Sequence, residues 1–194
     1  MGWADVPVSL HIGQAVNGDL MDAFLGVCHS IAHKLGAEFH LPHGLANALM
    51  IANVIRYNAA DIPTKQTAFS QYDRPKGIAR YAEIARHLGL GGSRDHERVE
   101  KLVAWVEELK TALDIPASIQ AAGVPETEFL AKLDKMTVDA FDDQCTGANP
   151  RFPLIAEIKQ LLLDSYYGRP YAEAYTRIRE GATEVIPLSK KVSA

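Results

Sequence analysis

Apolar side chains recur at steps of three and four along most of this chain, and this spacing constrains the fold more than any other feature of the sequence. One such stripe consists of Ala23, Phe24, Val27, Ile31 and Leu35, and another of Val99, Leu102, Val103, Val106, Leu109 and Leu113. No segment shows the alternation of apolar and polar residues that is typical of a half-buried strand. The sequence therefore predicts an all-α fold, a multi-helix bundle of about seven to nine helices.

Glycine and proline residues suggest where these helices begin and end. Gly36 is expected to stop the first helix, the apolar run 45–57 to form the buried centre, and the polar segment 58–74 to be a long loop. Later helices are expected to begin near Pro75, Pro116, Pro125, Thr137 and Pro153, the last of them running to about Tyr166.

The composition excludes several classes of protein. The chain has 194 residues, which suits one domain, and it has a formal net charge of -4, which gives no reason to expect a nucleic-acid partner. No uncharged apolar run is long enough to cross a membrane. With only two cysteines and no C-x-x-C motif, a reduced cytoplasmic protein is expected.

Four of the seven histidines fall within fifteen residues, namely His29, His33, His40 and His43. Helix positions four apart differ by about 40° in direction, so His29 and His33 should lie on one helix face. A short loop and an antiparallel helix would return His43 to the same place. Neutral imidazole is a good ligand for iron, zinc, nickel or copper. On spacing alone, ordinary polar residues that are solvated or hydrogen-bonded are the favoured interpretation.

The sequence around these histidines is more specific than their spacing. Residues 24–36, FLGVCHSIAHKLG, followed by residues 41–48, LPHGLANA, resemble the signature of the iron-containing alcohol dehydrogenases. Three further segments resemble the alcohol dehydrogenase part of bifunctional aldehyde/alcohol dehydrogenases: 53–58 (NVIRYN), 63–75 (PTKQTAFSQYDRP) and 141–151 (FDDQCTGANPR). The resemblance extends from about residue 22 to residue 168 and points to the C-terminal helical domain of such enzymes.

The resemblance implies a catalytic metal, usually Fe²⁺ with Zn²⁺ as the alternative, held by one aspartate and three histidines. Two of these ligands match His29 and His43, and the other two lie upstream in the family. His33 matches a position that faces the nicotinamide of NAD and can help to move a proton. Cys145 matches a segment near the same end of the cofactor, although a buried packing role is equally expected for it. His40 matches no ligand.

The resemblance also suggests how the chain is organised. We expect residues 1–21 to be a segment unlike the family, 22–186 to be the helical metal-binding domain, and 187–194 to be a tail. The glycines at 89–92 follow a helix, so they do not fit a dinucleotide-binding fingerprint. The nucleotide-binding domain of the family is therefore expected to be missing, and this polypeptide to be inactive alone towards small alcohols and aldehydes.

Two other classes of function fit the sequence. A surface that the nucleotide-binding domain normally covers would favour self-association, so the chain is also a candidate interaction or oligomerisation module. A third interpretation is an autonomous metal-binding helical protein that uses His29, His33 and His43 together.

Overall fold

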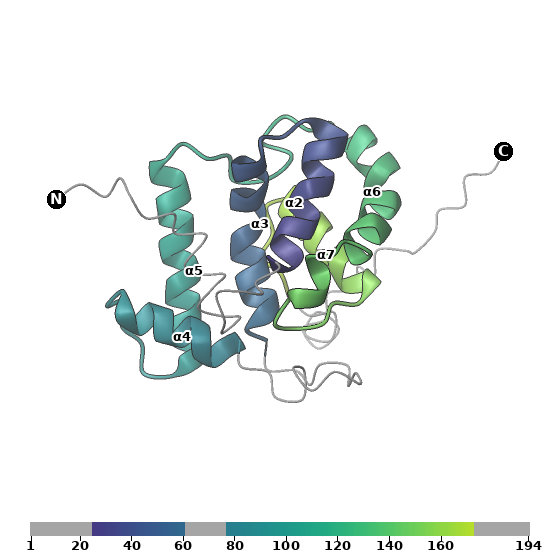
Figure 1. Cartoon of the computed structure of the whole chain (residues 1–194). Helices are drawn as coiled ribbons and strands as arrows, with labels where there is room; N and C mark the ends of the chain where they lie inside the picture. Colours follow the sequence, from purple (N-terminus) through teal and green to yellow (C-terminus); the bar gives the residue numbers. More distant parts are fainter. Residues whose placement is uncertain (1–24, 61–76, 173–194) are drawn as a thin grey trace, which may run out of the picture.

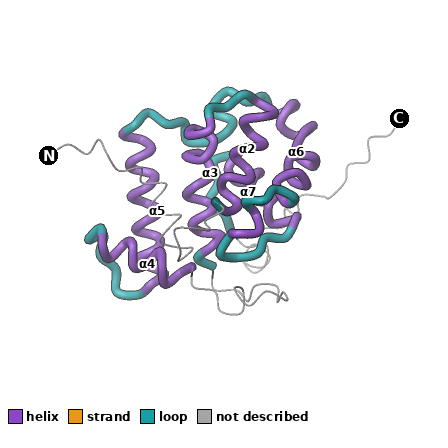
Figure 2. The backbone as a smooth tube through the Cα atoms, in the orientation of Figure 1, coloured by secondary structure: helices purple, strands orange, loops and turns teal. Residues whose placement is uncertain are grey.

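The computed structural model describes residues 25–60 and 77–172, and in these two ranges all regular secondary structure is helical. The elements are α2 (Gly26–Phe39), α3 (His43–Asn58), α4 (Gly77–His87), α5 (Asp95–Ala112), α6 (Glu126–Phe141), the short 3-10 helix η2 (Thr146–Ala148) and α7 (Ile155–Tyr166). No strand occurs in the described ranges, as Figure 2 shows. The predicted all-α class is confirmed.

Helices α2 and α3 form a hairpin, and α2 runs past the glycine that was expected to stop it. Gly36 lies inside α2, which continues to Phe39. His40 ends the helix in a left-handed conformation, with a φ of 56°, and its backbone N–H donates to the carbonyl of Gly36. An interior glycine costs a helix only about 1 kcal/mol, so the predicted stop at Gly36 was wrong. His40 itself lies in the connection, as expected.

Helix α3 lies at the centre of the molecule, between α2 and α7 on one side and α5 on the other (Figure 1). Its residues contribute to two hydrophobic clusters. Met50 and Tyr57 belong to the larger cluster, with α2, α6 and α7, whereas Ala52 and Ile55 belong to the smaller one, with α4 and α5. An apolar helix without a polar face is explained by burial on both sides, and the prediction that residues 45–57 form the buried centre is confirmed.

Two of the expected helix starts, at Thr137 and near Pro116, were wrong. Thr137 lies inside α6, where its hydroxyl donates to the carbonyl of Leu133 and no separate helix begins. Around Pro116 the chain makes turns rather than a helix. Proline is common in turns as well as at helix starts, and a threonine inside a helix can satisfy its hydroxyl at the carbonyl four residues earlier, so neither residue alone marks a helix start. Pro125, by contrast, directly precedes α6, as predicted.

Some predictions fall outside the described residues. The expected loop 58–74 is described only up to residue 60, and the expected boundaries at residues 21 and 187 lie in undescribed ranges. These remain predictions. Among the described helices none is long and apolar enough to cross a membrane.

Candidate metal and proton-transfer site

The α2–α3 hairpin brings three of the four clustered histidines together. The ring centroids of His29 and His43 are 5.2 Å apart, those of His33 and His43 are 5.4 Å apart, and those of His29 and His33 are 6.3 Å apart. His29 and His33 lie one turn apart on α2, and His43 is the first residue of α3. His40 is at the C-terminus of α2 and has no ring contact with the other three.

The geometry of His29 and His43 fits a shared metal ion. Two imidazoles that each place a nitrogen about 2.1 Å from one metal have their ring centroids about 5 Å apart. The observed separation is 5.2 Å, and the two ring planes are inclined by 53°. Nδ1 of His29 is buried, and within the described ranges no group meets the geometry of a hydrogen bond to it.

The surroundings of His29 favour its neutral form. Burial lowers the pKa of this imidazole, and the neighbouring His43 and His33 lower it further, while the backbone of Leu25 acts in the opposite direction. Only the neutral imidazole has a lone pair for a metal. His43 is exposed, by contrast, and its Nε2 lies 3.1 Å from Nδ2 of Asn47, which also donates to the backbone carbonyl of His43. A metal at Nε2 would replace the first of these two contacts.

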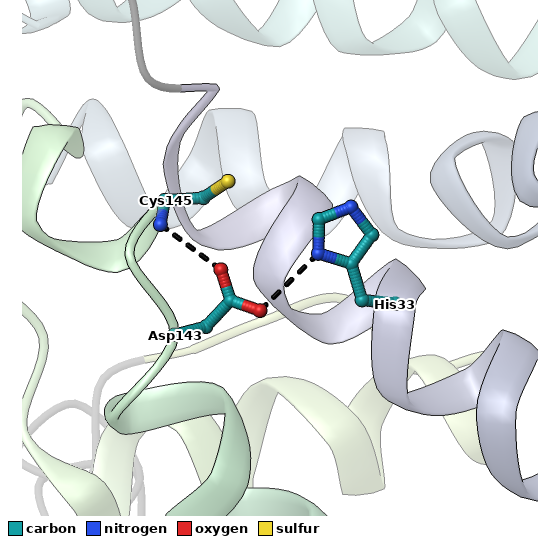
Figure 3. A group of neighbouring side chains, drawn as sticks. All are labelled: His33, Asp143 and Cys145. Carbon is teal, nitrogen blue, oxygen red and sulfur yellow. Dashed lines mark hydrogen bonds and ion pairs between the residues drawn. The ribbon is translucent and has the colours of Figure 1, made fainter.

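His33 is held by an aspartate from a distant part of the chain. Nδ1 of His33 lies 3.2 Å from Oδ2 of Asp143, and the ammonium of Lys34 lies 2.9 Å from the same oxygen. Oδ1 of Asp143 accepts the backbone N–H of Cys145 at 2.9 Å (Figure 3). Burial raises the pKa of this carboxyl, but the three donors outweigh burial, so the pKa of Asp143 lies well below its usual range.

Cys145 is buried next to this carboxylate. Burial raises the pKa of its thiol, an effect that the backbone of Leu25 partly offsets. In the described ranges, one group of three side chains of types that can bind a metal has its donor atoms within 4.8 Å of one another. It consists of His33, Asp143 and Cys145. Lys34 already occupies the carboxylate of this group, and an ammonium ion beside a metal cation is unfavourable. We therefore regard these three residues as a hydrogen-bonded group.

Sequence reasoning did not identify three polar residues around the histidines. Asn47 contacts His43, Asp143 contacts His33, and Lys34 binds Asp143. Asn47 follows His43 by four residues on a predicted helix, so their contact is visible in the spacing. Asp143 is 110 residues away from His33. Only the packing of α2 against α6 and η2 brings these two residues together.

The comparison with known families decides to which family this site belongs. The C-terminal profile of the Fe-containing alcohol dehydrogenase family matches residues 9–166, which is most of the chain. This chain belongs to that family. The matched range includes α2, α3 and every described residue of the histidine site.

Individual relatives agree with this assignment. Over 163 residues the chain is 67% identical to a bifunctional aldehyde-alcohol dehydrogenase of Escherichia coli, which covers 83% of this chain and 18% of that protein. It is 51% identical over 149 residues to an aldehyde-alcohol dehydrogenase of Clostridium acetobutylicum, which covers 77% of this chain and 17% of that protein. The chain thus spans less than a fifth of the length of these two relatives.

The fold agrees as well. An iron-containing alcohol dehydrogenase from Thermococcus thioreducens superposes with a TM-score of 0.58 and 34% identity, over 75% of this chain and 32% of that one. A 1,3-propanediol oxidoreductase superposes with the same TM-score and 28% identity, over 73% of this chain and 33% of the other. The chain is the helical C-terminal domain of this family, as it occurs in the bifunctional enzymes.

Proposed function

We propose that this chain supplies two metal ligands, His29 and His43, and a proton-transfer histidine, His33, to an iron-dependent, NAD-linked alcohol dehydrogenase. The reaction is the interconversion of a small alcohol, ethanol in the first instance, and its aldehyde. The observation that carries the proposal is the 5.2 Å separation of the His29 and His43 rings in a protein of the Fe-containing alcohol dehydrogenase family.

The donor set favours a catalytic metal over a structural one. Structural zinc sites usually have four protein ligands, most of them cysteines, whereas catalytic sites keep one coordination position open for water or substrate. His29 is half-buried and His43 is exposed, so the two rings lie at the surface of the helical domain. We propose Fe²⁺ for this site, with Zn²⁺ as the alternative metal.

Bound Fe²⁺ would polarise the alcohol oxygen, and NAD would accept the hydride from the alcohol carbon. The residues of this chain have the remaining tasks. His29 and His43 orient the site, and His33, whose side chain is 39% exposed, lies next to His43, where it can take up the hydroxyl proton. We propose that Cys145 lies near the nicotinamide, although its side chain is buried in the helical domain.

Two imidazoles alone leave most coordination positions to water, so the affinity of this chain for metal should be low. We propose that an aspartate and a further histidine come from a nucleotide-binding region outside the helical domain. Residues 1–194 by themselves should then have no alcohol dehydrogenase activity. The protein is expected to work in the cytoplasm, and we retain self-association as a property to be measured.

Reconstitution tests the proposal. The chain is mixed with the nucleotide-binding region of the Escherichia coli relative, supplied as a separate polypeptide with Fe²⁺ under anaerobic conditions, and ethanol oxidation is followed through NADH absorbance. Activity is expected only in the mixture. His29→Ala and His43→Ala should abolish it, and His40→Ala is the matched control that should retain it. Ethanol oxidation by the chain alone, or by the mixture that contains His29→Ala, would contradict the proposal.

A further inference from the structure

The hydrogen bond between His33 and Asp143 fixes which nitrogen of the imidazole carries its proton. An ionised carboxylate only accepts hydrogen bonds. Asp143 receives three donors, the backbone N–H of Cys145, the ammonium of Lys34 and Nδ1 of His33. The depressed pKa of the carboxyl keeps it ionised at neutral pH. Nδ1 must therefore carry a hydrogen, because two lone pairs at 3.2 Å would repel each other.

The other nitrogen of His33 then has the lone pair. No group in residues 25–60 or 77–172 forms a hydrogen bond with Nε2 of His33, and this nitrogen lies on the side of the ring away from Asp143 (Figure 3). The side chain is 39% exposed, whereas that of Asp143 is 9% exposed. Asp143 is thus the buried, fixed partner, and Nε2 of His33 is the accessible acceptor.

The carboxylate is itself held rigidly. Its Oδ1 closes a turn onto the N–H of Cys145 at the end of α6, and Lys34, the neighbour of His33 on α2, binds Oδ2 at 2.9 Å. The same oxygen thus joins two consecutive residues of α2 to a turn 110 positions further along the chain. This arrangement fixes the tautomer and the direction of the ring, as a carboxylate does for metal-bound histidines.

We propose that Asp143 is the positioning residue of the proton-transfer step: it holds His33 as the Nδ1–H tautomer, so that Nε2 accepts the hydroxyl proton of the alcohol and returns it in the reverse reaction. The proposal rests on the role of His33 in the proposed function. The tautomer itself is a property of this chain and is measurable without metal, NAD or activity.

The test is the tautomer of His33 in the chain with a chelator, recorded by ¹⁵N–¹H correlation through the imidazole at a pH of about 9, where imidazoles are neutral. The charge-assisted hydrogen bond should favour the Nδ1–H tautomer by about tenfold or more. In Asp143→Asn, the amide oxygen can keep the N–H of Cys145, and the NH₂ group then faces Nδ1. This variant should reverse the tautomer to Nε2–H.

Two further variants separate positioning from a general structural effect. Asp139→Asn removes a carboxylate of α6, the helix just before Asp143, where it pairs with Lys135, and this variant should leave His33 unchanged. Lys34→Gln removes the ammonium but keeps the acceptor, and it should also keep the Nδ1–H tautomer. A wild-type His33 in the Nε2–H form would overturn the proposal, and so would an Asp143→Asn chain with the wild-type tautomer or a Lys34→Gln chain without it.

These outcomes are independent of the proposed function. If the reconstituted enzyme is inactive but His33 follows the predicted tautomers, the proposed function is wrong and the positioning remains. If activity is reconstituted but His33 does not depend on Asp143, the positioning is wrong. In an active mixture, Asp143→Asn should lower kcat at least about tenfold and leave KM nearly unchanged, since it changes the tautomer of the proton acceptor His33 and no binding contact.

Discussion

Replacement of Gly26 by alanine should destabilise the domain at the helix that carries His29 and His33. Gly26 is the first residue of α2 and has a φ of +76°, which L side chains rarely adopt. A non-glycine residue in this conformation costs about 1–2 kcal/mol. The added Cβ would also lie 3.0 Å from Oδ1 of Asn149, the atom that accepts the buried N–H of Val27.

The displaced Asn149 would weaken that hydrogen bond, which contributes about 0.5–1.5 kcal/mol. The two effects together predict a loss of about 2–3 kcal/mol in the free energy of unfolding. With a urea m-value of about 2 kcal/mol per molar, the unfolding midpoint should fall by about 1–1.5 M. Gly44→Ala is the matched control. Gly44 is the second residue of α3, nothing would lie within 4 Å of the new Cβ, and alanine forms helix better than glycine by up to about 1 kcal/mol.

Equilibrium urea unfolding, followed by circular dichroism at 222 nm, measures both variants. A Gly26→Ala chain as stable as the wild type, or a Gly44→Ala chain that is less stable than Gly26→Ala, would refute this account of how α2 begins.

Two further predictions concern buried polar groups. Arg151→Ala should lower the free energy of unfolding by about 3–5 kcal/mol, because it leaves the partly buried Glu157 without its guanidinium partner. Arg94→Ala removes an exposed ion pair and should change the free energy of unfolding by less than about 1 kcal/mol in the same urea assay. Equal effects of the two variants would contradict the argument. Burial raises the pKa of the Tyr81 hydroxyl to about 12, against which the hydrogen bond from Asn58 acts. The unfolded chain thus releases this proton at a lower pH than the folded one, so stability should fall as the pH rises from about 10 to 12. Urea midpoints should fall less steeply over this range in Tyr81→Phe, and identical slopes would contradict the shift.

The sequence predicts the helices well where an apolar stripe is long and poorly where only a single residue marks an end. The stripe from Val99 to Val106 identifies α5, and the apolar run in α3 identifies the central helix. The helix end expected at Gly36 and the helix start expected near Thr137 were wrong. The free-energy cost of one glycine or one β-branched residue inside a helix is smaller than the stabilisation that tertiary packing of the helix contributes.

The candidate site shows the same division. His29 and His33 lie one turn apart on α2, and His43 lies at the start of α3 across the short connection. Local geometry and the family resemblance were therefore enough to predict that the three rings lie near one another. Asp143 lies in a turn 110 residues later, and its approach to His33 depends on how α6 and η2 pack against α2. No periodicity predicts a contact of this kind, since it is fixed by tertiary packing alone.

The central claim is that His29 and His43 hold a metal and that His33 does not. Anaerobic calorimetric titration of the chain with Fe²⁺, and in parallel with Zn²⁺, tests it most directly. One weak site per chain is expected, and its affinity should fall by about tenfold or more when one of the two ligands is removed in His29→Ala or in His43→Ala. His33→Ala and His40→Ala should bind within about twofold of the wild type. Unchanged binding by His29→Ala, or loss of binding in His33→Ala alone, would contradict the account.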